Sequence, residues 1–218
     1  ANIDLIKKLY PNTVRIAFVT DNSYEGAALG TLMREVIVEK YPELNLASLR
    51  GLSFSMSQIR VRMRHLPENS VVLLGTWRVD KNGRYYQESS IKEIFPEDFN
   101  LPVFTMTGVG LGEWAVGGYI PQKEWDVEHI VEDLHRYNMG EKTESLFKFT
   151  ESKYVFSKEK LQEYGLSEDK LPNGTEIVSE VDEEVQRYQK YLGIAITLTV
   201  VFLVMTMTIF MLLQRNKR

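Results

Sequence analysis

The sequence contains no cysteine, and this absence removes several classes of chemistry. Disulfide bridges, thiolate metal sites and cysteine nucleophiles are all excluded. Positive charge is not in excess either, because 26 Lys and Arg stand against 30 Asp and Glu and the net charge is −4. We therefore expect no nucleic-acid partner. One basic run fits the solvated face of a helix: Arg60, Arg62, Arg64 and His65.

The short motifs of common catalytic and nucleotide-binding sites are also missing. There is no P-loop and no nucleophile-elbow motif. His129 and His135 lie six residues apart on one expected helix, which does not bring two ligands to one metal. Gly108 to Gly112 follows the fourth expected strand and does not fit the dinucleotide pattern. We expect no catalytic residue, no metal and no cofactor in this part of the protein.

One long uncharged run is present near the end of the chain, from Tyr191 to Leu213. At about 1.5 Å per residue, a helix of this length spans the roughly 30 Å hydrocarbon core of a bilayer. A buried core helix is the alternative, but helices inside soluble domains are rarely apolar on all sides over such a length. The run therefore predicts a transmembrane helix over 191–213, in contact with membrane lipid.

The flanks of this run predict its orientation. Residues 214–218 carry three cations, whereas acidic residues crowd the approach over 176–184. Cationic flanks stay in the cytoplasm. We therefore expect residues 1–190 outside the cytoplasm and 214–218 as a cytoplasmic basic flank.

Residues 1–140 show the alternation of a doubly wound, Rossmann-like α/β domain. Apolar runs typical of buried strands lie at 14–19, 44–49, 71–74, 102–106 and 117–120. Helical patterns lie between or after them, at 24–40, 55–66, 89–95 and 123–137. This alternation predicts a five-stranded parallel sheet in the order 2-1-3-4-5 with helices on both faces. In the last helix, four apolar residues are expected to face inward: Val127, Ile130, Val131 and Leu134.

The alternation stops after Gly140. Residues 146–149 and 154–156 look like short extended segments, and 158–164 like a short helix ended by Gly165. Leu171 to Thr175 has the composition of a turn. We expect 141–177 to form a membrane-proximal appendage outside the α/β repeat.

The pattern from 178 to 190 indicates a charged juxtamembrane helix that continues into the membrane. Its apolar residues have the a/d spacing of a coiled coil over about two heptads: Val178, Val181, Val185, Tyr188 and Leu192. A single amphipathic helix that rests on the domain is the alternative, because two heptads alone do not hold a coiled coil together. Gly193 and Thr197 would let two membrane helices approach closely. The pattern favours a homodimer.

Ligands of open parallel sheets bind beyond the carboxyl ends of the strands, and the expected strands here end in polar and aromatic residues. Such a set suits a small polar organic ligand stacked on an aromatic ring, while ordinary loop caps are the alternative for each residue. Trp77 is expected to be partly exposed, because a Trp at the mouth of a strand has little to pack against. The candidate ligand-binding residues are Asp21, Asn22, Tyr24, Trp77, Arg78, Thr107, Gly108 and Tyr119.

Two stretches resemble a known family. From Leu5-Ile6-Lys7-Lys8-Leu9-Tyr10-Pro11 to Val116-Gly117-Gly118-Tyr119, the chain resembles the second lobe of substrate-binding proteins of the type I periplasmic fold. More closely, it resembles the sensor regions of bacterial two-component histidine kinases, in which a charged hairpin follows the third strand, as in 74–84 here. Residues 161–175 are similar to the segment before the membrane helix of those kinases, although Tyr164 stands where a tryptophan is more usual.

The resemblance implies a two-lobed sensor in the bacterial cytoplasmic membrane, with a first lobe before this sequence and a kinase module after Arg218. Our leading hypothesis is the ligand-sensing extracytoplasmic portion of such a receptor. A membrane-tethered substrate-binding component of an ABC transporter is one alternative. A membrane-anchored structural or assembly protein is the other.

Overall fold

The computed structural model describes residues 1–122, 127–140, 151–179, 191–199, 202, 205 and 206. The chain divides into two compact units, Ala1–Val178 and Ser179–Arg218. The first contains a seven-stranded sheet with helices on both faces. The second contains the helix over 191–199.

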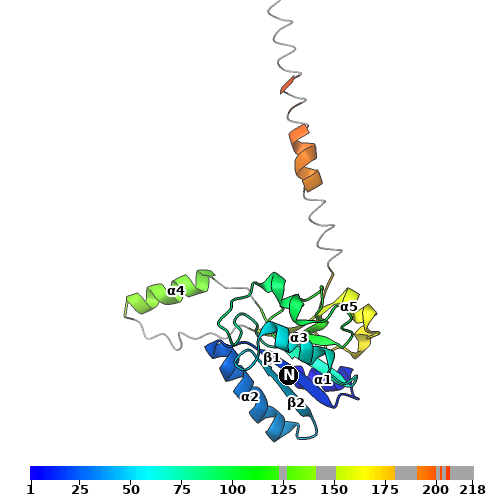
Figure 1. Cartoon of the computed structure of the whole chain (residues 1–218). Helices are drawn as coiled ribbons and strands as arrows, with labels where there is room; N and C mark the ends of the chain where they lie inside the picture. The colour runs from blue at the N-terminus through cyan, green and yellow to red at the C-terminus, as the bar shows by residue number, and fades with distance from the viewer. Residues whose placement is uncertain (123–126, 141–150, 180–190, 200–201, 203–204, 207–218) are drawn as a thin grey trace, which may run out of the picture. The chain divides into compact units, whose positions relative to one another are not determined.

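The predicted order and parallel direction of the first five strands are confirmed. These strands follow the order β2-β1-β3-β4-β5, and each neighbouring pair among them is parallel (Figure 1). Leu73, in β3, has no exposed surface, as expected for a strand covered on both faces. The bounds are β1 (Arg15–Thr20), β2 (Asn45–Arg50), β3 (Ser70–Leu74), β4 (Val103–Thr105) and β5 (Gly117–Pro121).

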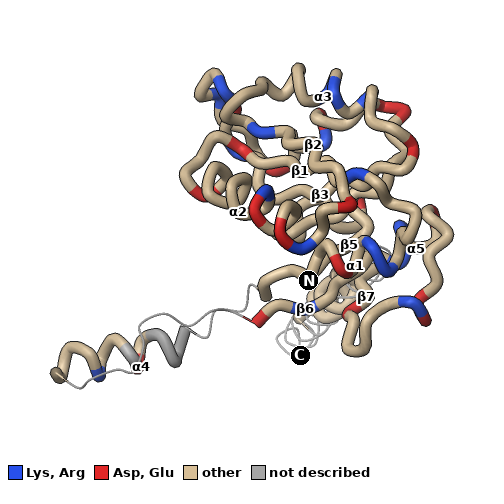
Figure 2. Tube along the Cα trace, turned by 90° about the horizontal axis from the view of Figure 1, so that it is seen from below, with Lys and Arg blue, Asp and Glu red and all other residues tan. Residues whose placement is uncertain are grey.

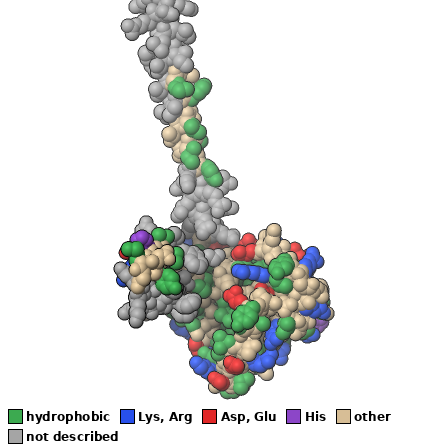
Figure 3. Space-filling model, turned by 90° about the vertical axis from the view of Figure 1, so that its left-hand side faces the viewer, with side chains coloured by type: hydrophobic (Ala, Val, Ile, Leu, Met, Phe, Trp, Pro, Cys, Tyr) green, Lys and Arg blue, Asp and Glu red, His purple; other side chains and the backbone are tan. Residues whose placement is uncertain are grey.

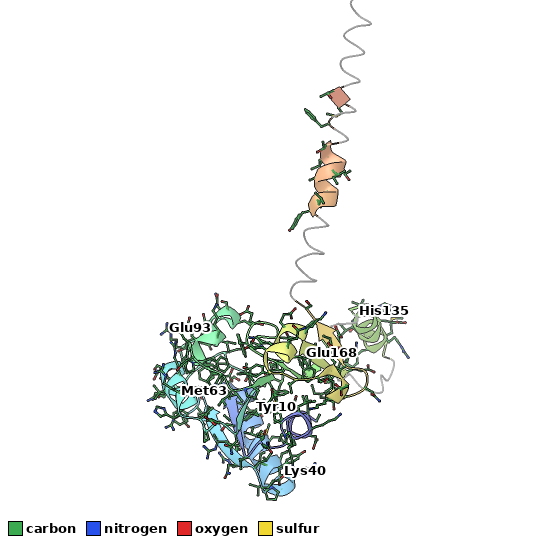
Figure 4. The ribbon with its side chains drawn as sticks, turned by 90° about the vertical axis from the view of Figure 1, so that its right-hand side faces the viewer. Tyr10, Lys40, Met63, Glu93, His135 and Glu168 are labelled. Carbon is green, nitrogen blue, oxygen red and sulfur yellow. The ribbon has the colours of Figure 1, made fainter. Side chains whose placement is uncertain are left out.

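Helices cover both faces of this sheet, as predicted. One face packs against α1 (Asn2–Leu9), α2 (Tyr24–Lys40) and α5 (Lys158–Glu163). The other packs against α3 (Met56–Arg64) and the 3₁₀ helix η1 (Glu88–Ile94). Figure 2 shows α3 on one side of β1, β2 and β3, with α1 and α2 on the other. Met63, labelled in Figure 4, is 1% exposed and belongs to the core under α3.

Serines begin the helices that follow β1 and β2. The Ser23 hydroxyl accepts a hydrogen bond from the Gly26 amide at 3.0 Å and caps α2. Ser55 forms a capping box with Gln58 at the start of α3. The sequence predicts a Ser cap for α3, at Ser55 or Ser57, and the structure selects Ser55.

The segment expected as an appendage instead extends the sheet. β6 (Ser152–Ser157) pairs antiparallel with β5, and β7 (Glu176–Val178) pairs parallel with β6, so the sheet is mixed and seven-stranded. Phe156 is fully buried in the same core cluster as Leu73. Glycine makes this pairing possible, because a Cβ on Gly117 would lie 2.5 Å from the Val155 carbonyl oxygen. Residues 141–150 lie outside the described part of the chain.

The local predictions that fall on described residues of this segment are confirmed, whereas the extended stretch expected at 146–149 lies outside them. Gly165 follows α5 with a φ of 62°, as a residue that ends a helix often does. The turn at Leu171–Thr175 is present, with Gly174 at a φ of 78°. A short 3₁₀ helix, η2 (Glu168–Lys170), lies between the two.

The helix predicted over 123–137 is described as α4 (Val127–Asn138), but its apolar residues do not all face inward. Val131 is 59% exposed and Leu134 is 51% exposed, so that part of the prediction is wrong. Helical spacing identifies an apolar stripe but does not identify what covers it. The side chains of Val127 and Ile130 lie outside the described part.

The juxtamembrane predictions fall mostly outside the described residues. Val178 is the last residue of β7, so it does not begin a helix, and 180–190 are not described. Residues 191–199 are helical, with exposed apolar side chains that include Leu192, Ile194 and Ile196 (Figure 3). Within the part of the chain that the structure describes, no helix has the length and apolarity needed to cross a membrane. The span over 191–213 stays a prediction.

Candidate functional site

The carboxyl ends of the parallel strands meet at one edge of the sheet. The Gly75 amide donates to the Val19 carbonyl oxygen at 2.9 Å, and the Gly51 amide donates to the Thr20 carbonyl oxygen at 2.6 Å. These bonds carry the parallel pairing past the last residues of the strands. The loops after β1, β2 and β3 therefore begin side by side, at the edge where ligands bind to open α/β sheets.

A hollow of about 310 Å³ opens at this edge, next to the loops that follow β3 and β4. Three candidate residues line it: Trp77, Arg78 and Thr107. Tyr86 and Glu88 also line it, and the sequence analysis does not single them out. Arg78 and Glu88 are exposed, and neither forms an ion pair with another described residue. The hollow thus combines a cation, a carboxylate, hydroxyl groups and aromatic surface.

The prediction that Trp77 is partly exposed is wrong. Its side chain is 1% exposed and belongs to the core cluster between the sheet, α3 and η1. The ring centroid lies 6.2 Å from that of Tyr86, with a tilt of 38° between the ring planes. The loop after β3 turns back over the sheet face, so Trp77 has a large packing surface that a freely projecting strand end would lack. It forms part of the wall of the hollow from within the core.

A hairpin holds Tyr86 at the hollow. Val79 and Tyr85 form an antiparallel bridge, as the predicted charged hairpin requires. The buried Asp80 carboxylate organises this turn, because it accepts hydrogen bonds from the Asn82 amide at 2.9 Å and the Tyr86 hydroxyl at 2.9 Å. Burial acts to raise the pKa of Asp80, but these and other hydrogen bonds outweigh it and hold the pKa below its usual value. The Asp-Lys-Asn-Gly sequence at 80–83 is a signal for such a turn.

Asp21 ties the loop after β1 to the loop after β3. One carboxylate oxygen accepts hydrogen bonds from the Ser23 amide at 3.1 Å and from the Ser23 hydroxyl at 2.5 Å. The other accepts from the Arg78 amide at 2.9 Å. Asp21 is only 1% exposed, so in this structure its carboxylate positions the backbone of Arg78 and does not line the hollow.

The other candidates from the first loop also lie away from the hollow. The backbone amide of Asn22 donates to the Val79 carbonyl oxygen at 2.8 Å and so joins the loop after β1 to the hairpin. Gly51 lies in the same junction, where a Cβ would stand 2.7 Å from the Val79 carbonyl oxygen. Tyr24 begins α2 and is 93% exposed.

The two candidates from β4 and β5 have structural partners. Gly108 turns the chain after β4 with a φ of 83°, a conformation that favours glycine. Tyr119 exchanges two hydrogen bonds with the Asn2 side chain, at 2.8 and 3.1 Å, and its ring lies 4.8 Å from that of Tyr154. Neither residue lines the hollow beside Thr107.

Comparisons with known proteins address the fold. No family model and no curated protein matches this sequence. A substrate-binding protein with adhesive properties from Clostridium difficile, in its ligand-free, open form, has 12% identity and a TM-score of 0.55 over 82% of this chain. An ABC domain in complex with L-Trp from Streptococcus pneumoniae has 15% identity and a TM-score of 0.56 over 81% of this chain.

The fold is similar to that of substrate-binding-protein-like domains. A conserved domain protein from Vibrio cholerae is similar at 16% identity, with a TM-score of 0.57 over 81% of this chain. This chain spans only 58% to 59% of the length of these proteins. The resemblance to substrate-binding proteins is thereby confirmed at the level of the fold, while the resemblance to sensor histidine kinases stays a prediction.

Three buried polar side chains are unpartnered along the carboxyl edge of the parallel strands. Among the described residues, the Thr20 hydroxyl, the Thr76 hydroxyl and the Trp77 indole nitrogen have no hydrogen-bond partner. An unmade hydrogen bond of this kind costs about 1–3 kcal/mol. These groups come from the ends of β1 and β3, so the edge that carries the hollow is also an edge with unused hydrogen-bonding capacity.

Proposed function

We propose that this chain is the ligand-sensing part of a membrane-anchored receptor, and that a small amphoteric organic molecule of the amino-acid class binds in the hollow beside Trp77. The observation that carries the proposal is the hollow itself. It lies at the carboxyl edge of the parallel sheet, and it gathers Trp77, Arg78 and Thr107 from two separate loops. Ligand sites of open α/β sheets occupy this edge.

The charges of the hollow indicate the class of ligand. The Arg78 guanidinium suits a carboxylate, and the Glu88 carboxylate suits an ammonium group. Tyr86 contributes an aromatic ring and Thr107 a hydroxyl to the same hollow. A molecule that bears both charges on a small organic frame would match all four residues. The similar domain from Streptococcus pneumoniae carries L-Trp, which is a molecule of this kind.

The affinity of this chain for such a ligand is expected to be low. Drug-sized ligands are usually buried over most of their surface. Here one lobe forms one wall, and the similar solved proteins are longer than this chain, which spans 58% to 59% of them. We expect a dissociation constant above about 1 µM, because much of the ligand would stay in contact with water.

The proposed test is isothermal titration of the full chain in detergent micelles with each of the 20 standard L-amino acids. We expect at least one to bind, and Arg78→Ala to weaken that binding at least about tenfold, which corresponds to ~1.4 kcal/mol and to a lost charge-assisted hydrogen bond. Arg64→Ala is the matched control, because Arg64 is also exposed but does not line the hollow. The proposal fails if no amino acid binds at millimolar concentration, or if the two variants weaken binding equally.

The membrane anchor in this proposal rests on the sequence. The uncharged run from Tyr191 to Leu213 and the basic flank after it support a single span with residues 1–190 outside the cytoplasm. A cysteine-free chain allows a direct test with Asn82→Cys and Asn216→Cys. In intact cells, a membrane-impermeant maleimide should label the first variant and not the second. Equal labelling of both would contradict the orientation.

The signalling class is inferred from the resemblance to sensor histidine kinases and from the a/d spacing ahead of the span, which supports a homodimer. A transporter-associated substrate-binding component is the second candidate, because one similar structure is a substrate-binding protein. The reading frame beyond Arg218 separates the two. A dimerisation helix with a phosphoacceptor histidine supports the kinase, and its absence there refutes it.

A further inference from the structure

One edge of the sheet is an open strand. β2 is the terminal strand of the sheet, and within the described residues nothing pairs with its outer side. The backbone amide of Asn45 donates to the Val14 carbonyl oxygen at 2.8 Å, so the backbone of Asn45 bonds toward β1. Parallel pairing alternates along a strand, and Leu46 and Ser48 therefore direct their N–H and C=O groups away from β1.

This edge lacks two of the usual protections against strand addition, a proline and a β-bulge. The six residues of β2 contain no proline, and their register with β1 is continuous, without a bulge. Native proteins commonly blunt an exposed edge with one of these devices. The opposite edge, β7, has only three residues. β2 thus offers a longer template on which a further strand could pair.

A hollow of about 660 Å³ lies beside this edge, between β2 and α3. Its apolar lining includes Ala47 and Leu49 of β2 and Val61 of α3. Side chains of one strand alternate between the two faces of a sheet. Every second side chain of an added strand would therefore enter this hollow, next to Ala47 and Leu49.

The hollow is basic. Arg15, Arg62 and His65 line it, and no Asp or Glu does. The Arg62 guanidinium lies 4.0 Å from the centroid of the Phe54 ring, a stacked position that limits its movement. Figure 2 shows Lys and Arg positions along α3, on the β2 side of the domain.

The positive charge of this hollow decides between two possible occupants of the β2 edge, a second copy of this chain and an acidic partner. In an antiparallel pairing of β2 with β2 of a second copy, a two-fold axis perpendicular to the sheet places both α3 helices on the same face. The two hollows, each lined by Arg15, Arg62 and His65, would then lie next to each other. Like charges brought together in this way oppose association. An acidic partner meets no such opposition.

We propose that β2 and α3 form a strand-addition site for an extended acidic segment of another protein, with alternate apolar and acidic side chains of that segment in the hollow. The backbone of Leu46 and Ser48 supplies hydrogen bonds, while Ala47, Leu49 and Val61 receive apolar side chains. Arg15 and Arg62 select the acidic ones. This site lies apart from the hollow beside Trp77, because the two share no lining residue.

The experiment uses a fluorescein-labelled ten-residue peptide of alternating valine and threonine, with glutamate at two of the valine positions, and a matched peptide with lysine there. Fluorescence anisotropy with the full chain in detergent micelles should show binding of the glutamate peptide at least about tenfold tighter than the lysine peptide, a difference of ~1.4 kcal/mol. Arg62→Glu should reduce or reverse this preference. Arg64→Glu is the control on the same helix, and it should leave the preference unchanged because Arg64 does not line the hollow.

Two further variants test the strand geometry. Ser48→Pro removes an amide that points away from β1, so it should abolish peptide binding while the sheet stays intact by circular dichroism. A peptide with N-methyl groups on the residues that face β2 should also fail to bind, and this arm needs no change in the protein. Equal binding of the two charged peptides, binding that survives N-methylation, or a homodimer that Ser48→Pro dissociates would each overturn the proposal.

Discussion

Removal of the Asp80 carboxylate should destabilise the hairpin after β3, which holds Tyr86 at the candidate ligand site. Asp80 is 1% exposed, and its carboxylate accepts hydrogen bonds from the Asn82 amide at 2.9 Å, the Arg84 amide at 3.2 Å and the Tyr86 hydroxyl at 2.9 Å. Asp80→Ala deletes all three hydrogen bonds at once. Asp80→Asn keeps the shape of the side chain but removes its charge and replaces one of its two acceptor oxygens by an NH2 donor.

The magnitude follows from these bonds. Each donor left without a partner costs about 1–3 kcal/mol, toward the lower end where water can reach it. Asn82 and Arg84 are exposed residues, so water can replace part of their loss. We expect Asp80→Ala to lower the free energy of unfolding by about 3 kcal/mol and Asp80→Asn by about 1–2 kcal/mol. For a domain of this size, a loss of 3 kcal/mol corresponds to a fall in Tm of roughly 6–12 °C.

The assay is urea and thermal unfolding of the full chain in detergent micelles, followed by tryptophan fluorescence. A double-mutant cycle with Tyr86→Phe should give a coupling energy of about 0.5–3 kcal/mol between the two side chains, because they share a hydrogen bond. A loss below about 1 kcal/mol in Asp80→Ala, or additive effects in the cycle, would show that the carboxylate does not hold the hairpin.

The pH dependence supplies a second test of the same contact. The pKa of Asp80 is lowered in the folded state, so the native protein favours the ionised carboxylate more than the unfolded chain does. Its contribution is therefore complete above the unfolded pKa of about 3.9 and is lost as the pH falls through the lower folded pKa. The difference in Tm between wild type and Asp80→Asn should be constant near pH 7 and should shrink below about pH 4.

Two further predictions concern the extension of the sheet. Phe156→Ala should cost about 3–5 kcal/mol in urea unfolding, because the side chain is fully buried and its ring contacts Phe104 edge to face at 6.3 Å; a loss below about 1 kcal/mol would mean that β6 is not part of the core. Gly118→Ala should destabilise the protein by more than Gly174→Ala. A Cβ at Gly118 would meet the Thr105 carbonyl oxygen at 2.0 Å, whereas Gly174 faces open space at a φ of 78° and its substitution should cost only about 1–2 kcal/mol. Equal losses would contradict the close approach of β4 and β5.

The parallel core could be predicted from the sequence because its determinants are local. The apolar run Val71 to Leu74 can be buried on both faces only in a sheet that helices cover twice, and that is where the structure places it. Ser55 caps its helix, and Gly174 turns the chain after Leu171, through contacts within a few residues. The position of the candidate site at the carboxyl edge could be predicted from the same alternation of strands and helices, because parallel strands all end on one side of the sheet.

The lining of the hollow depended on contacts between distant residues. Asp21 reaches the backbone of Arg78 across 57 positions, and the hairpin places Tyr86 against Trp77 in the core. The sequence pattern could identify Trp77 as a candidate ligand-binding residue, but it could not show that the loop of Trp77 folds back over the sheet. Tyr119 was named by the same rule, yet its neighbours Asn2 and Tyr154 hold it in the middle of the sheet.

Only the tertiary structure decided where the sheet ends. The sequence by itself determined that Tyr154, Val155 and Phe156 favour an extended segment, since β-branched and aromatic residues fit a pleated surface. Pairing of that segment with β5 requires Gly117 to admit the Val155 carbonyl oxygen, a fit between segments almost 40 residues apart. Strand pairing is set by which surfaces remain to be covered once the core has formed, and no local pattern contains that information.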